Sequence, residues 1–155
     1  MLVKRSLKLE DANAICDRAL AIGREIKLRP LGVAVLDSGG NIVVLKTEDG
    51  SGTLRVEIAV GKAHAALGMG TDSRNLRDRM LDRPSFQNAI SVAAQGRYIP
   101  VPGGVLIEDQ EGYAIGAVGI TGDTSEKDEY CAIKAIQHSG FKSLPREIDP
   151  NWDAR

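Results

Sequence analysis

The chain has 155 residues, with 20 Lys and Arg against 21 Asp and Glu, so its formal net charge is −1. This length is typical of one domain with a buried core, and the balanced charge argues against a general nucleic-acid binder. Hydrophobic residues make up 43% of the chain and charged residues 26%, which excludes disorder of the whole chain. Because the sequence has no long apolar run and its N-terminus leads directly into charged residues, we expect a cytoplasmic protein without membrane contact.

The first half of the chain predicts a helix and then a β-hairpin. Residues 9–26 repeat apolar side chains at spacings of three and four, as in an amphipathic helix. The apolar runs 31–36 and 42–45 flank turn residues 37–41, which predicts two antiparallel strands. Their nearly continuous apolar character suggests that both strands are buried on both faces.

A second predicted helix, residues 54–69, carries a stripe of small residues (Gly61, Ala65 and Gly68) that would let another backbone come close. A short charged helix over 72–81 and a helix over 84–96 follow. Tyr98 and Ile99 form a short extended piece.

The second half predicts another hairpin and a last helix. Strands are expected over 105–107 and 113–121, and a helix over 125–139, with Asp123 or Thr124 as its N-cap. We read 1–155 as a single domain with a polar C-terminal tail, 145–155. The order of elements predicts an α+β fold, in which helices pack on an antiparallel sheet.

Strong catalytic motifs are missing from the sequence, which has no phosphate-binding loop, His-Glu-x-x-His or Cys-x-x-Cys. Cys16 and Cys131 lie far apart in helical patterns, and we expect them to be buried free thiols. The acids Asp123, Glu126, Asp128 and Glu129 fit capping of the last helix better than metal binding.

Several residues remain as candidates for binding or catalysis. His64 lies beside Gly61 and Gly68, where it could bind iron, carry a proton or simply pack. His138 fits the end of the last helix, where a cation is favoured. The Pro-Gly-Gly loop (Pro102, Gly103 and Gly104) offers N–H groups to an anion, unless it is only a tight turn. Cationic side chains could hold a carboxylate or could be solvated surface: Arg55, Lys62, Arg79 and Arg83.

Four segments in series resemble the motifs of the GlcG/HbpS-like family, which includes the C-terminal domain of PduO. They are residues 31–43, 58–63, 102–107, and 116–122 followed by Asp128-Glu129. The matching positions include Lys62, Pro102, Gly103, Gly104, Asp128 and Glu129.

The resemblance implies a profilin-like α/β/α sandwich with a five-stranded antiparallel sheet, a homo-oligomer, and a link to haem or to catabolic operons. The first hypothesis is therefore a small-ligand or haem-binding protein. Its pocket would lie between the second helix and the Pro-Gly-Gly loop, at a subunit interface, with His64 as the iron ligand and Arg79 or Arg83 as propionate partners.

Two other hypotheses stay open. One is an enzyme that acts on an oxo- or hydroxy-acid. In it, Gly103 and Gly104 would polarise a carbonyl, and His64 or Glu129 would move a proton. The other is an interaction protein without a ligand.

Overall fold

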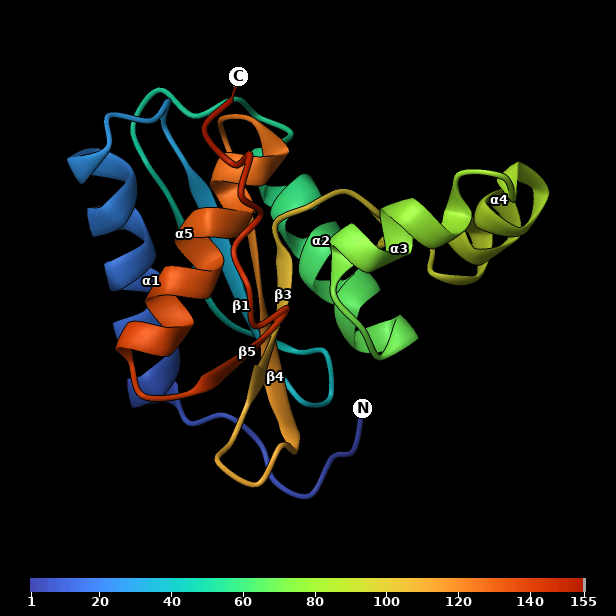
Figure 1. Cartoon of the computed structure of the whole chain (residues 1–155), viewed down its shortest axis with the longest axis horizontal. Helices are drawn as coiled ribbons and strands as arrows, with labels where there is room; N and C mark the ends of the chain where they lie inside the picture. The colour runs from blue at the N-terminus through green and yellow to red at the C-terminus, as the bar shows by residue number, and fades with distance from the viewer. Residues whose placement is uncertain (155) are drawn as a thin grey trace.

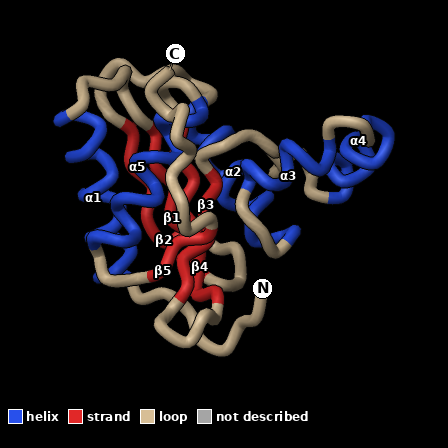
Figure 2. The backbone as a smooth tube through the Cα atoms, in the orientation of Figure 1, coloured by secondary structure: helices blue, strands red, loops and turns tan. Residues whose placement is uncertain are grey.

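Five antiparallel strands form one open sheet at the centre of the computed structural model, which describes residues 1–154 (Figures 1 and 2). The sheet order is β2-β1-β4-β3-β5. The strands are β1 (Gly32–Asp37), β2 (Ile42–Thr47), β3 (Gly104–Glu108), β4 (Ala114–Thr121) and β5 (Lys142–Leu144). Both predicted hairpins are confirmed, and β1 joins them by pairing with β4, where Val35 lies opposite Val118.

Helices cover both faces of this sheet. On one face lie α1 (Leu9–Glu25) and α5 (Ser125–His138), and on the other lies α2 (Arg55–Met69), as Figure 1 shows. The larger apolar core lies between the sheet, α1 and α5, and a smaller core lies beneath α2. The predicted α+β sandwich is therefore confirmed.

Burial differs between the two strands of the first hairpin. Five of the six residues of β1 are buried, as predicted, whereas in β2 only Val44 is buried. The expectation for β2 was wrong because this strand lies at one edge of the sheet. Ile42 is 52% exposed there.

Glycine permits α2 to lie close against the sheet. A Cβ atom at Gly119 of β4 would overlap the backbone carbonyl of Ala59. The small-residue stripe of α2 is used as predicted at Gly61, whose carbonyl accepts the N–H of Ile99 at 3.2 Å. The segment of Tyr98 and Ile99 meets α2 at this point and belongs to no helix or strand.

Two further helices, α3 (Ser73–Met80) and α4 (Pro84–Ala93), project away from the sandwich, with α4 at the far end (Figure 1). The Asp72 side chain accepts the N–H of Asn75 and so caps α3. No residue of α4 is buried. Val92 is 79% exposed and Phe86 is 42% exposed, so this arm presents apolar side chains to the surroundings.

The start of α5 departs from its predicted cap. Thr124 is the N-cap residue, but its side chain makes no capping hydrogen bond. Asp123 instead accepts the N–H groups of Arg29 and Thr124, because its carboxylate turns toward the loop before β1.

The C-terminal tail packs on its own chain. The Trp152 ring stacks on Tyr130 of α5, with 3.8 Å between the ring centroids. Trp152 is therefore half-buried. Cys16 and Cys131 are buried and free, as predicted. Among the described residues, no helix is long and apolar enough to cross a membrane.

Candidate functional site

A small hollow lies between the second half of α2 and the projecting arm. Its volume is about 230 Å³, and its walls include His64, Met69, Ile90, Arg97 and Tyr98. Leu76 of α3 packs with Tyr98 behind this wall. The hollow is thus mostly apolar, with an imidazole, a phenol and a guanidinium at its surface.

His64 is half-buried on the wall of this hollow. Burial lowers the pKa of its imidazole below 6.5, and the positive charge of Arg97 lowers it further. The ring is therefore neutral at neutral pH. A neutral imidazole can bind a metal ion or accept a proton.

Tyr98 lines this hollow, although the sequence did not mark it as a candidate site residue. Its side chain is only 5% exposed, and its hydroxyl is buried without a hydrogen-bond partner among the described residues. Burial raises the pKa of this phenol, although the positive charge of Arg79 lowers it in part. A buried hydroxyl without a hydrogen-bond partner is costly for the fold.

The three arginines near the hollow lie in different settings. Arg97 lines the hollow, and Arg79 is an exposed residue of α3 whose charge reaches the Tyr98 hydroxyl. Arg83 lies over the ring of Phe86 at the start of α4, 4.5 Å from the ring centroid, and is not part of the wall. The structure thus brings Arg79 toward Tyr98 and adds Arg97 to the wall beside His64, whereas it gives Arg83 another contact.

Lys62 lies inside the protein. Its ammonium donates to Asp128 at 3.1 Å and to the backbone carbonyl of Ile120 at 2.9 Å. Burial raises the pKa of Asp128 to about 6 and lowers that of Lys62, and each charge offsets part of the effect on the other. With 2% and 1% of their side chains exposed, the two residues form an internal pair that links α2 to α5.

The Pro-Gly-Gly loop is packed rather than open. Pro102, Gly103 and Gly104 are all buried. The Gly104 N–H donates to the Ser73 hydroxyl at 2.7 Å, and a Cβ atom there would overlap the backbone carbonyl of Lys62.

Because of this packing, the pocket that we expected between α2 and the Pro-Gly-Gly loop is not present within residues 1–154. The space between α2 and the loop is filled by Lys62 and Ser73. The positive φ, +119°, belongs to Gly103, whose carbonyl accepts the N–H of Ile120. The hollow lies instead further along α2.

Glu129, the other candidate proton carrier, lies apart from the hollow at the start of α5. One carboxylate oxygen is 3.3 Å from Arg74, and the other is buried without a hydrogen-bond partner. Burial raises the pKa of this carboxyl to about 7, although the positive charge of Arg74 lowers it. Within residues 1–154 there is no group of three or more side chains arranged to hold a metal ion.

The structure is thus that of a small α+β protein. Its hollow is mostly apolar and has one neutral imidazole on its wall. The family model described as haem degrading protein HbpS-like matches residues 7–137. The chain therefore belongs to the HbpS-like family, and the expected family resemblance is confirmed.

One curated protein and two solved structures are also similar to this chain. An uncharacterized 15.0 kDa protein from the dhaT-dhaS intergenic region of Citrobacter freundii is 27% identical over 107 residues, which is 69% of this chain and 74% of that protein. The crystal structure of Klebsiella pneumoniae ORFY matches with a TM-score of 0.80 and 23% identity, over 90% of this chain and 94% of that one. A PduOC:heme complex matches with a TM-score of 0.78 and 24% identity, over 88% and 96%. At these identities, the two structures establish the shared fold.

Proposed function

We propose that this protein binds haem in the hollow between α2 and α4. The observation that carries the proposal is the neutral, half-buried His64 imidazole on the wall of a mostly apolar hollow that Arg97 also lines. A ligand that offers both an apolar face and a polar group would satisfy this wall. The family's description as haem degrading and the heme complex of PduOC, a protein of the same fold, support haem over other ligands.

The side chains at the hollow fit haem in kind. Met69 and Ile90 offer apolar contact to a planar ring, and His64 would be the iron ligand. Arg97 on the wall, together with Arg79 whose charge reaches Tyr98, would hold the negatively charged propionates. Bound haem would supply a redox-active iron, while the chain would bind and orient it.

The hollow of one chain is smaller than the about 300–1,000 Å³ of sites that enclose a small molecule. We therefore propose a homo-oligomer in which a second copy completes the site. The exposed Phe86 and Val92 of the neighbouring helix α4 support this arrangement.

Titration with haemin, followed by absorbance, tests the proposal. We expect a sharp haem band for the wild type and for His138→Ala, and at least a tenfold loss of affinity for His64→Ala. Tyr98→Phe should weaken binding less, since it removes only a hydrogen bond. Equal spectra for wild type and His64→Ala would exclude His64 as the ligand, and no band in the wild type would overturn haem binding.

An enzyme acting on an oxo- or hydroxy-acid is the second candidate function. Arg97 could hold the carboxylate in the same hollow, and the neutral His64 could accept a proton. Glu129 is 1% exposed and paired with Arg74, so it would not share this role. Nuclear magnetic resonance (NMR) shifts at His64 on addition of glycolate, in a protein that gives no haem band, would favour this function.

A further inference from the structure

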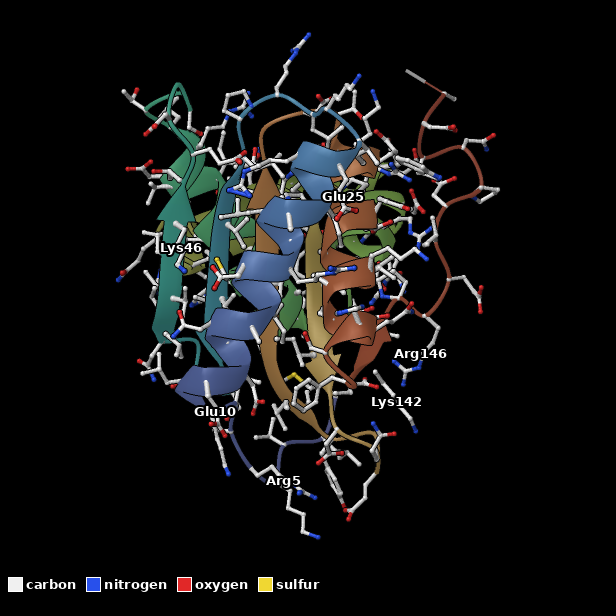
Figure 3. All side chains as sticks on the ribbon, turned by 90° about the vertical axis from the view of Figure 1, so that its left-hand side faces the viewer. Arg5, Glu10, Glu25, Lys46, Lys142 and Arg146 are labelled. Atoms are coloured by element: carbon white, nitrogen blue, oxygen red, sulfur yellow. The ribbon has the colours of Figure 1, made fainter. Side chains whose placement is uncertain are left out.

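A second recess lies on the opposite side of the sheet, between α1 and α5. Its volume is about 310 Å³, within the range of small-molecule sites. Ile22 and Ile26 of α1 supply its apolar wall, and Tyr130 of α5 supplies an aromatic one. Figure 3 looks onto this face, where the two helices run side by side and Glu25 marks the upper end of α1.

Positive charge dominates this recess. Arg18 and Lys134 line it together with His138, and Glu25 is the one acid among the lining residues. None of these four side chains takes part in a salt bridge within the described residues, although nearby Arg24 is paired with Glu48. The recess therefore keeps two unneutralised cations on facing helices.

Arg18 provides the second observation. Its side-chain Nε is buried and has no hydrogen-bond partner in the described part of the chain. A buried guanidinium N–H is a strong donor, and leaving it unpaired is costly. Lys134 approaches the ring of Tyr130, with its ammonium 6.0 Å from the ring centroid. Lys134 thus lies beside the aromatic wall, and Arg18 lines the same recess from α1.

We propose that the α1–α5 recess binds a small organic oxyanion, either a carboxylate or a phosphate ester. Arg18 would donate to the oxyanion from α1, and Lys134 would neutralise it from α5. Glu25, at the other end, would accept a hydrogen bond from a hydroxyl of the same molecule. The site is separate from the His64 hollow, because the sheet lies between α2 and the α1–α5 layer.

Titrations of the full chain with succinate and with inorganic phosphate, followed by NMR of backbone amides at constant ionic strength, test this site. At least one of the two anions should shift signals of α1 and α5 near Arg18 and Lys134. Arg18→Gln and Lys134→Gln should each weaken that binding about tenfold, the effect of losing a charge-assisted hydrogen bond. Comparing the two anions distinguishes a carboxylate site from a phosphate site.

Lys142→Gln is the matched control, since Lys142 lies on the same face beyond the recess (Figure 3) and should leave the affinity unchanged. Lys134 is exposed, so its variant will fold even if the Arg18 variant does not. Binding of neither anion, or equal weakening by all three substitutions, would overturn the proposal.

Discussion

The Glu129 carboxyl group makes the stability of the fold depend on pH. Its pKa is about 7 in the folded protein, against 4.5 for an ordinary glutamate, so between these values the folded state binds more protons than the unfolded state. The free energy of unfolding should therefore fall as pH rises from about 4.5 to 7, by up to about 3 kcal/mol.

Urea unfolding of Glu129→Gln between pH 5 and pH 8 measures this contribution. The amide cannot ionise, so the variant should show a flatter pH dependence and should gain stability relative to the wild type at pH 8. Glu126→Gln is the control, because Glu126 is on the same helix turn but its side chain is 22% exposed. If Glu129→Gln keeps the wild-type slope, the buried carboxyl is not the group that titrates.

Two glycines on the α2 side differ in what surrounds them. A Cβ atom at Gly104 would overlap the Lys62 carbonyl and would come within 2.9 Å of the Ser73 hydroxyl, whereas nothing lies within 4 Å of one at Gly68. Gly104→Ala should therefore lower the free energy of unfolding by about 1–3 kcal/mol, and Gly68→Ala, in a helix, should raise it by up to about 1 kcal/mol. Thermal melting compares them, and a Gly104 variant as stable as the wild type would show that the loop is open after all.

The residues of the candidate site were only partly predictable. His64 stood out because it is one of two histidines and lies among small residues of a helix. Lys62 could not be recognised as buried, because its partner Asp128 is 66 positions away and the pair forms only when α2 and α5 meet the same end of the sheet. The burial of Tyr98 could not be predicted from the sequence, because it depends on packing against Leu76 of helix α3.

The helices and strands with a clear periodicity of apolar residues were predicted from the sequence, whereas the short strand β5 was not. The long helices and both hairpins follow directly from apolar spacing and turn residues. The sequence pattern did not show β5, because a strand of three residues, Lys142–Leu144, is too short to alternate. It exists through its pairing with β3, in which Ser143 lies opposite Ile107.

Helix α4 has no core of its own and should depend on a second copy. A ten-residue helix is only marginally stable in isolation, and Val92 on it is 79% exposed. We expect Val92→Lys to weaken self-association at least tenfold, because it places a charge in an apolar contact. The sandwich should keep its melting temperature.

Light scattering and circular dichroism of this variant check the dependence on α4. The control is Leu54→Lys, since Leu54 is 68% exposed just before α2, away from the arm. If the wild type is monomeric at tens of micromolar, or if the Val92 variant self-associates as strongly as the wild type, α4 does not contact a second copy.

For the whole molecule, the proposed haem site and the proposed homo-oligomer are expected to be linked. The hollow beside His64 is bounded by α4 on one side and is too small in a single chain to enclose a large planar ligand. If a second copy closes the site, each event must favour the other by the same factor, because binding free energies are reciprocal. Haem should then stabilise the oligomer, and the apparent haem affinity should rise with protein concentration.

Haemin titrations of the wild type at about 1 μM and about 50 μM test this linkage. We expect tighter apparent binding per chain at the higher concentration, and weak, concentration-independent binding for Val92→Lys, whose side chain lies on α4 but outside the hollow wall. The Leu54→Lys control should follow the wild type. An affinity that is the same at both concentrations would mean that one chain forms the complete site, with the arm of α3 and α4 closing over the ligand by itself.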